Sequence, residues 1–263
     1  MLGERVNLFK MGTGMVRTLI AGNWKMNGLK SALSEIDQVV AGLAELPDGA
    51  DCLICPPATL IGAMVARAGD RLKVGGQCVH NKTNGAHTGD ISAEMLVDSG
   101  ASYVIVGHSE RRDDHAERSA YVKSQAGAAL RAGLIPIVCV GEEYAQRKRG
   151  ETAEVIERIM RKSLPEMKDG GHGLVVAYEP KWAIGTGEIP TMAEIGEVHA
   201  LIRKVLVDTY GMDGLKMPIL YGGSMKPGNA AEILAVNDVN GGLIGGASLK
   251  AADFMSIYET AVA

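Results

Sequence analysis

Eight short apolar segments recur along the chain, and stretches with helical spacing lie between them. The segments are four to six residues long and rich in Ile, Val and Leu, and they occupy residues 18–22, 52–55, 72–76, 103–107, 135–140, 174–178, 218–221 and 242–245. Continuous apolar runs of this length are typical of parallel strands that are buried on both faces. Eight strand–helix units in about 245 residues match a closed (β/α)8 barrel in both count and length.

A doubly wound α/β sheet is the alternative fold for such an alternating pattern. It usually has fewer strands and a glycine-rich turn after its first strand, whereas the first segment here ends in Gly22-Asn-Trp-Lys25. No Ser/Pro-rich linker and no block of like charges divides the chain, so we expect a single domain, residues 17–263. Residues 1–16 precede any clear element and are predicted to form an N-terminal extension that can be disordered, unless Met15 is the natural start.

Two of the intervening stretches show helical spacing most clearly. Apolar residues recur every three or four positions in both of them. They are Leu33, Ile36, Val40 and Leu43 in the first, and Ile195, Val198, Ile202 and Val205 in the sixth. The sixth opens with Thr191-Met-Ala-Glu194, a capping box whose outer side chains bond the free N–H groups at a helix start.

The charge of the chain and its amino end each exclude a class of protein. With a formal net charge of −4 and a pI near 5.9, the chain lacks the basic excess of a general nucleic-acid binder. The first seventeen residues carry four charged side chains and no long apolar stretch, unlike a signal peptide or a membrane anchor. We therefore expect a cytoplasmic protein that binds neither nucleic acid nor a membrane.

Cys52 and Cys55 have the spacing of a metal-binding C-x-x-C motif, but they lie within one apolar segment. Residues three apart on a strand point to opposite faces, so the two thiols cannot share a metal there. We interpret them as small buried hydrophobic residues. Cys139 has no base beside it in the sequence and is interpreted as a packing residue rather than a nucleophile.

In a barrel, chemistry takes place at the carboxyl ends of the strands, and Glu179 closes one apolar segment. Pro180 stops the strand there, because proline has no N–H to continue a sheet. The loop that follows has Gly185 and Gly187 at its tip between stiffer flanks, which is the layout of a lid that closes over a carboxylate. The alternative is an ordinary loop with a solvated glutamate.

Asn23 and Lys25 follow the first segment, with Trp24 between them. The two-residue period of a strand places Asn23 and Lys25 on one face and Trp24 on the other. A lysine at the mouth of a barrel suits an anionic substrate. The alternative is a surface lysine that extends past Trp24 into solvent.

His108 follows the fourth segment and precedes a predicted helical turn. The N–H groups of such a turn disfavour an imidazolium, so we expect a neutral ring that donates a hydrogen bond to a carbonyl. Glu110 is placed to pair with Lys25 across the mouth of the barrel. Arg111 and Arg112 are interpreted as a solvated or salt-bridged face.

Tandem glycines end the seventh and eighth segments, in Tyr221-Gly-Gly-Ser224 and in Gly245-Gly-Ala-Ser248. Glycine lets backbone N–H groups approach an anion closely, and a predicted helix start follows each pair. Each pair alone could be a tight turn. The loops after strands 7 and 8 are where barrels commonly bind phosphate, so the two pairs together favour a phosphate site.

A polar stretch of fifteen residues, 77–91, follows the third segment and carries His80, His87 and Thr88. Loops of that length inside a compact domain are usually functional. Because this one carries no phosphate-binding pattern, we assign it to a contact between subunits. A flexible surface loop is the alternative.

Taken together, these residues resemble the triosephosphate isomerase family. The blocks that carry the resemblance run in order from about Thr18 to the carboxyl end: Asn23-x-Lys25, Gly107-His-Ser-Glu-Arg-Arg112, Cys139-Val-Gly-Glu142, Ala177-Tyr-Glu-Pro180, Trp182-Ala-Ile-Gly-Thr-Gly187, Tyr221-Gly-Gly-Ser224 and Gly245-Gly-Ala-Ser-Leu249. The resemblance implies a TIM barrel that interconverts dihydroxyacetone phosphate and D-glyceraldehyde 3-phosphate in glycolysis and gluconeogenesis. It also implies a homodimer and no metal or organic cofactor.

The family's roles carry over by position. The resemblance implies that Glu179 is the base that moves a proton between two carbons, and that His108 is the neutral electrophile. Lys25 would stabilise the enediolate and the phosphate, with Asn23 beside it. Phosphate binding is implied for four further residues, Gly185, Ser224, Gly245 and Gly246.

Three places depart from the family's common pattern. Lys181 lies at the first hinge of the predicted lid, where an aliphatic residue is usual, and Glu188-Ile-Pro190 replaces a commoner lysine-led triplet at the second hinge. Cys78 stands where asparagine is frequent in the loop 77–91. These departures leave the chemistry intact and bear on the lid and on the subunit contact.

Three other functions can be distinguished from the triose isomerase. A same-family isomerase acting on a four-carbon ketose phosphate is the nearest, and the intact Gly185-Thr-Gly187 tip favours the triose. A Schiff-base aldolase would use Lys25 as its nucleophile. A barrel kept only as a binding module should have lost Lys25, His108 or Glu179, and all three are present.

Overall fold

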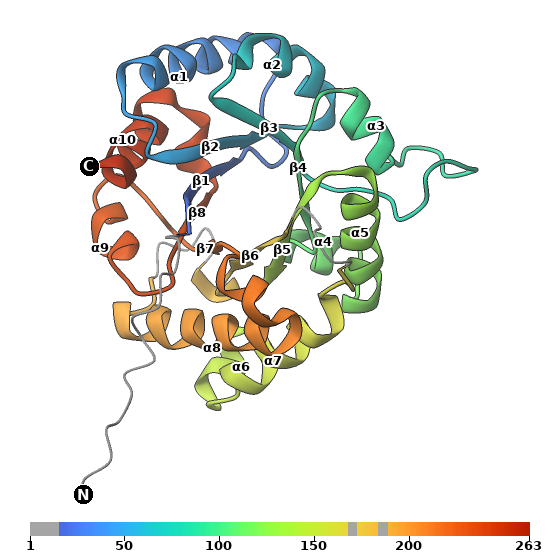
Figure 1. The fold of residues 1–263 in the computed structure, drawn as a ribbon, viewed down its shortest axis with the longest axis vertical. Coiled ribbons are helices and arrows are strands. Elements are labelled where there is room, and N and C mark those ends of the chain that lie inside the picture. The colour runs from blue at the N-terminus through green and yellow to red at the C-terminus, as the bar shows by residue number, and fades with distance from the viewer. Residues whose placement is uncertain (1–15, 168–172, 184–188) are drawn as a thin grey trace, which may run out of the picture.

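The computed structural model describes residues 16–167, 173–183 and 189–263, and their strands form one closed parallel barrel (Figure 1). Each strand pairs with the next along the chain, and the last pairs back with the first. The strands are β1 (Thr18–Asn23), β2 (Ala50–Cys55), β3 (Leu72–Gly76), β4 (Tyr103–Val106), β5 (Ile135–Val140), β6 (Val175–Tyr178), β7 (Ile219–Tyr221) and β8 (Gly241–Ile244). The predicted (β/α)8 barrel is confirmed, with strand ends that differ by at most two residues.

Helices surround the barrel and return the chain from the carboxyl end of each strand to the start of the next (Figure 1). The α-helices are α1 (Leu33–Glu45), α2 (Ile61–Ala68), α3 (Ala93–Asp98), α4 (Ser109–Asp114), α5 (Ser119–Ala132), α6 (Tyr144–Lys148), α7 (Thr152–Ser163), α8 (Met192–Tyr210), α9 (Ala230–Leu234) and α10 (Ala251–Val262). Short 3-10 helices are η2 (Lys30–Ala32), η3 (Ala58–Leu60), η4 (Lys181–Ala183), η5 (Gly211–Leu215) and η6 (Gly246–Leu249).

Local signals in the sequence account for individual helices. The predicted capping box opens α8, where Thr191 N–H donates to Glu194 Oε2 at 2.8 Å and Glu194 N–H donates to Thr191 Oγ1 at 3.3 Å. In α1, Val39 is buried, whereas Val40, which we predicted to face the core, is only half-buried. Residues 1–15 lie outside the described residues, so the N-terminal extension stays a prediction.

Two sets of buried side chains stabilise the barrel. One set lies between the strands and the helices, and the other fills the inside of the barrel as a packed core rather than a channel. The inner set is Leu19, Ala21, Leu53, Cys55, Ile105, Ile137, Cys139, Val175, Ala177, Leu220 and Leu243. Cys52 belongs to the outer set and Cys55 to the inner one, which confirms that the two thiols face opposite sides of β2.

Closure of the barrel requires glycine at the start of β8. Gly241 has a φ of +134°, and a Cβ at this position would lie 1.9 Å from the carbonyl oxygen of Leu19. Any side chain would therefore force β8 away from β1.

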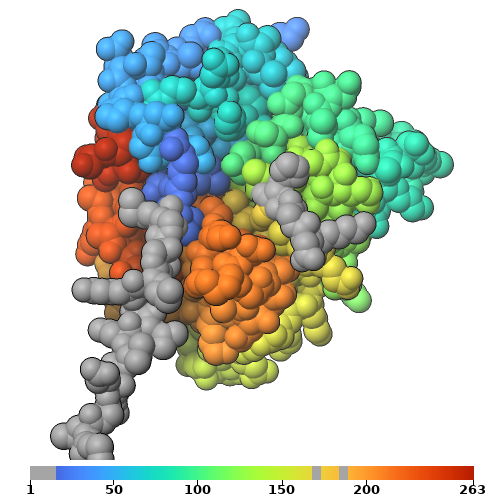
Figure 2. Space-filling view, in the orientation of Figure 1, coloured from blue at the N-terminus to red at the C-terminus, as the bar shows by residue number. Residues whose placement is uncertain are grey.

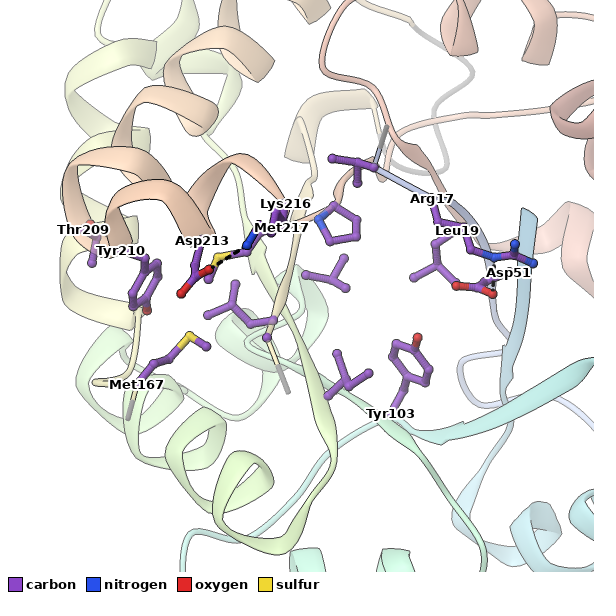
Figure 3. Close-up of a pocket in the computed structure, with 16 residues that line it drawn as sticks. Arg17, Leu19, Asp51, Tyr103, Met167, Thr209, Tyr210, Asp213, Lys216 and Met217 are labelled. Carbon is purple, nitrogen blue, oxygen red and sulfur yellow. Dashed lines mark hydrogen bonds and ion pairs between the residues drawn. The ribbon is translucent and has the colours of Figure 1, made fainter. Parts of the chain in front are cut away.

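A cavity of about 650 Å³ opens at the amino ends of the strands (Figure 3). Two ion pairs lie on opposite sides of it in Figure 3: Arg17 with Asp51 at 2.8 Å and Lys216 with Asp213 at 3.2 Å. Each charge is thus already paired, and in barrels the chemistry takes place at the other end of the strands. We therefore place the functional site elsewhere, despite the size of this cavity.

Among the described residues, no helix is both long enough and apolar enough to cross a bilayer.

Helix α8 carries a histidine that is completely buried. His199 Nδ1 lies 3.0 Å from the carbonyl oxygen of Asp238, and its ring packs edge-on against Tyr178 with the centroids 6.0 Å apart. Burial lowers the pKa of His199 from 6.5 to about 4, because the charged ring would lose its hydration. The ring is therefore neutral at neutral pH.

We expect mild acid to destabilise the fold through His199. Because the folded-state pKa of about 4 lies below the unfolded value of 6.5, the stability is fully present above pH 6.5 and is lost as the pH falls towards 4. The loss should be roughly 3 kcal/mol. The measurement is the melting temperature from pH 7 to 4 for the wild type and for His199→Gln, which cannot take up the proton. An equally steep decline in the variant would contradict the assignment.

Candidate active site

A second cavity, of about 580 Å³, opens at the carboxyl ends of the strands. The structure brings together on its wall seven of the predicted site residues: Asn23, Lys25, His108, Glu179, Ser224, Gly245 and Gly246. Gly185 and the rest of the predicted lid tip, Thr186 and Gly187, lie outside the described residues. Lys25 follows β1, His108 follows β4 and Glu179 follows β6, so three separate strands deliver the candidate catalytic side chains.

Glu179 is buried, with 2% of its surface exposed, and is not the solvated glutamate of the alternative interpretation. Its Oε1 lies 3.1 Å from His108 Nε2, and its Oε2 accepts the Ser109 N–H at 3.1 Å. Its own N–H donates to the Val140 carbonyl at 2.8 Å, which continues the strand ladder by one residue. The Cys139 thiol also hydrogen-bonds to this carboxylate, which is thus held by several donors and shielded from water.

His108 caps α4, and its hydrogen bonds indicate which ring nitrogen carries the proton. Nδ1 accepts the Glu110 N–H at 3.3 Å, so this nitrogen is unprotonated. The proton of a neutral ring must then be on Nε2, the nitrogen that faces Glu179 at 3.1 Å. The Glu110 N–H thus favours the tautomer that donates from Nε2, while the Glu110 carboxylate lies 3.7 Å from the same Nδ1. The neutral state of the ring stays a prediction.

Lys25 lies at a turn with a φ of +52°, and the side chain of Asn23 supports this turn by accepting the Lys25 N–H at 3.0 Å. The Lys25 ammonium lies 2.5 Å from Glu110 Oε1, which confirms the predicted pair. Trp24 is buried on the other side, where its indole N–H donates to the Ser248 carbonyl at 2.9 Å. Lys25 is therefore held at the cavity and does not extend freely into solvent.

The glycine-rich end of the cavity comes from β7 and β8. A Cβ on Gly246 would meet no atom within 4 Å, so packing does not require glycine there, and the backbone is open to a ligand. A Cβ on Gly245 would lie 3.5 Å from Lys25 Cε, so the lysine stem passes beside this backbone. Ser224 Oγ donates to the Ala183 carbonyl at 2.9 Å, and this bond must be exchanged if the hydroxyl is to bind phosphate.

Sequence reasoning missed the part that four residues play in the site, although Gly222 was assigned to a phosphate loop. Ser109 contributes only its N–H, which any residue at that position could supply. A Cβ on Gly222 would lie 2.8 Å from Glu179 Cγ, so this glycine makes room for the carboxylate as well as ending β7. Lys226 and Asp253 also line the cavity, and nothing in their surrounding sequence indicates it.

Cys139 is completely buried beside the carboxylate of Glu179. Burial, and secondly the negative charge of Glu179, raise the pKa of the Cys139 thiol well above its ordinary value. A thiol that does not ionise is a poor nucleophile, which confirms the prediction of a packing residue.

The interpretation of Arg112 as part of a solvated face was wrong. Its guanidinium donates to the carbonyls of Gly107 at 2.7 Å and Cys139 at 3.2 Å, and it is partly buried. It therefore joins the ends of β4 and β5 just beneath the site. Arg111 does form the predicted salt bridge, at 2.7 Å from Glu117.

The polar loop 77–91 is anchored at its base and projects beyond α3 at its outer part (Figures 1 and 2). Gln77 donates to the carbonyls of Lys25 and Cys55, both at 2.9 Å, and Gln125 donates to the Val79 carbonyl at 2.9 Å. The base of the loop therefore supports the turn at Lys25. Its role in a subunit contact stays a prediction.

One group of three potential metal ligands occurs among the described residues: His80, His87 and Asp90, on the same loop. His80 Nδ1 accepts the Lys82 N–H at 3.1 Å, which leaves the proton of the neutral ring on Nε2. That nitrogen faces Asp90 Oδ2 at 3.8 Å. A ring that binds a metal through Nε2 would have to carry its proton on Nδ1, so this arrangement favours a polar contact between the ring N–H and Asp90 over a metal site.

Comparisons with known proteins agree with this geometry. The family described as triosephosphate isomerase matches residues 18–261. A triosephosphate isomerase from Hyphomonas neptunium is 59% identical over 94% of this chain and 99% of its own length, and one from Afipia carboxidovorans is 57% identical over 94% and 98%. The crystal structure of triosephosphate isomerase from Bartonella henselae, 44% identical, matches 93% of this chain and 99% of its own with a TM-score of 0.85. The chain belongs to the triosephosphate isomerase family.

Proposed function

We propose that this chain interconverts dihydroxyacetone phosphate and D-glyceraldehyde 3-phosphate by moving a proton between adjacent carbons through an enediolate. As a member of its family, the chain is an intramolecular aldose–ketose isomerase. The observation that carries the residue assignment is the 3.1 Å contact between Glu179 and His108 Nε2, in a cavity that Lys25 also lines.

Glu179 is assigned as the base. Removing a proton next to a carbonyl requires a base that is close to the carbon and held in place. In the described geometry one oxygen accepts the Ser109 N–H and the other faces His108. A rotation of the side chain frees one oxygen for the substrate carbon.

His108 and Lys25 are assigned to the charge that develops on the substrate oxygens. The His108 Nε2–H that faces Glu179 can turn to a substrate carbonyl, where it stabilises the enediolate as it forms. The Lys25 ammonium stabilises the same charge and that of the phosphate. A general base supplies roughly 10²–10⁴-fold of a rate enhancement, so these two groups must supply much of the rest.

Phosphate binding is assigned to Ser224 and to the backbone of Gly245 and Gly246, with Asn23 supporting Lys25. The open space above Gly246 and the position of both glycines on the cavity wall support this assignment. Gly185 completes the proposed set. The reaction moves only protons, so its chemistry requires neither a metal nor an organic cofactor.

We also propose a cytoplasmic homodimer in which the loop 77–91 contacts the second subunit. The projection of this loop from the barrel and its exposed outer residues support the dimer. The charge of the chain, net −4, supports the absence of nucleic-acid partners.

A coupled assay for triose phosphate interconversion tests the function, with a tetrulose phosphate as the parallel substrate. Higher kcat/KM on the tetrulose would favour the four-carbon isomerase. Borohydride trapping of substrate on Lys25 would show an aldolase instead. The ion pair with Glu110 already argues against that, because a Schiff base needs a neutral amine.

Glu179→Asp should lower kcat by about 10²-fold or more, because shortening the side chain withdraws the base from the carbon by about 1 Å. Affinity for a phosphate-bearing inhibitor should stay nearly the same, since the glycine-rich end is untouched. Steady-state kinetics and inhibitor titration measure both. Near-normal turnover would remove Glu179 from the role of base.

Lys25→Ala should lower both kcat and affinity for the same inhibitor, by about 10²-fold in turnover, because the cation serves the enediolate and the phosphate. Lys216→Ala, at the opposite end of the barrel, is the matched control and should leave both unchanged. Unaltered inhibitor affinity in Lys25→Ala would contradict the assignment.

Replacing residues 82–89 by a short Gly-Ser linker should convert the dimer to a monomer, since this outer part of the loop is mostly exposed in the single chain. Sedimentation velocity measures the change, and circular dichroism controls for loss of the fold. A folded variant that remains dimeric would place the subunit contact elsewhere.

A further inference from the structure

Lys181 lies two residues after Glu179, and its ammonium lies between two carboxylates. Nζ is 2.7 Å from Asp113 Oδ1 and also pairs with Glu143 Oε1. The lysine side chain is only 17% exposed, whereas each carboxylate is 55% exposed. Burial lowers the pKa of Lys181, but its hydrogen bonds to Asp113 and Glu143 outweigh this and raise it, so the ammonium stays charged. This lysine is therefore an anchored cation and not a solvated one.

The two partners of Lys181 belong to the elements on either side of the base. Asp113 lies on α4, the helix whose first residue donates its N–H to Glu179 Oε2 at 3.1 Å. The segment 179–181 thus contacts α4 twice. Glu179 contacts the first turn of α4, and Lys181 contacts its last turn. Glu143 follows β5, beside Glu142, whose carbonyl accepts the Lys181 N–H at 3.2 Å.

We propose that Lys181 is a positioning residue for the reaction: its ammonium ties the segment that carries Glu179 to α4 and to the chain after β5, and so sets where the carboxylate lies relative to His108. This inference rests on the assignment of Glu179 as the base. His108 caps helix α4, and Lys181 forms an ion pair with Asp113 of the same helix. One helix therefore fixes both members of the pair.

The charge of Lys181 matters as well as its length. Asp113 and Glu143 both lie against one ammonium, so a neutral side chain would leave two carboxylates facing each other across the gap. Like charges at such a separation repel, which would push α4 and the chain after β5 apart. A hydrophobic residue of equal length would therefore displace Glu179 from His108, whereas an arginine can keep both ion pairs.

The test compares Lys181→Met, Lys181→Arg and the wild type in the triose phosphate assay. Lys181→Met should lower kcat about tenfold, as a displacement of less than 1 Å would, and leave KM within twofold. Lys181→Arg should restore most of kcat. Lys216→Met, which removes a lysine from the exposed pair with Asp213 at the other end of the barrel, is the matched control and should change neither constant.

A third variant distinguishes the repulsion between Asp113 and Glu143 from the loss of the two ion pairs of Lys181. Lys181→Met combined with Asp113→Asn and Glu143→Gln removes the repulsion, so its kcat should lie between those of Lys181→Met and the wild type. Added salt should lower kcat of the wild type, whose Lys181 pairs it screens, by more than it lowers kcat of the triple variant.

Melting temperatures of all variants distinguish a loss of kcat through displacement of Glu179 from a loss of kcat through a less stable fold. A kcat for Lys181→Met within twofold of the wild type would overturn the proposal. So would a loss that appears in KM alone, or one that Lys181→Arg does not restore. If the wild type itself fails to interconvert triose phosphates, it is the proposed function that fails, and this outcome is recognised before any variant is compared.

Discussion

The contact between the Glu179 carboxylate and the His108 imidazole is the interaction on which the rest of the site depends. The proposed roles require a neutral ring, because an imidazolium would pair with the carboxylate and weaken it as a base. One backbone group sets the tautomer: the Glu110 N–H occupies Nδ1 and leaves Nε2 as the donor. The start of α4 thus determines which ring nitrogen faces Glu179 with its proton.

Close packing of the backbone around Glu179 limits where its carboxylate can lie relative to His108. A Cβ at Gly141 would lie 1.7 Å from the Glu179 carbonyl oxygen, and a Cβ at Gly222 would lie 2.8 Å from Glu179 Cγ. The strand ends on both sides of β6 therefore approach Glu179 as closely as bare backbone allows. Side chains could not pack so tightly, because interiors already at close-packed density cannot absorb an extra methyl group without strain.

The fold could be predicted because strand and helix periods are local, and the count of eight fixes the architecture. The opposite faces of Cys52 and Cys55 and the pair of Lys25 with Glu110 followed from the same geometry. Arg112 was misjudged because its partners are two backbone carbonyls and two distant serine hydroxyls, which have no sequence signature. The partners of Lys181 could not be predicted either, since they lie far away in the chain and meet only in the closed barrel.

The electrostatics of the cavity explain how a chain of net charge −4 can bind an anion. Lys25 gives one of its three N–H donors to Glu110, 2.5 Å away, and this bond fixes the ammonium while two donors remain for a ligand. Two lysines, Lys25 and Lys226, and two acids, Glu179 and Asp253, line the cavity, so their formal charges balance. Under the proposed phosphate assignment, binding relies on directed N–H groups at Gly245 and Gly246, whose dipoles act at contact distance regardless of the charge of the whole chain.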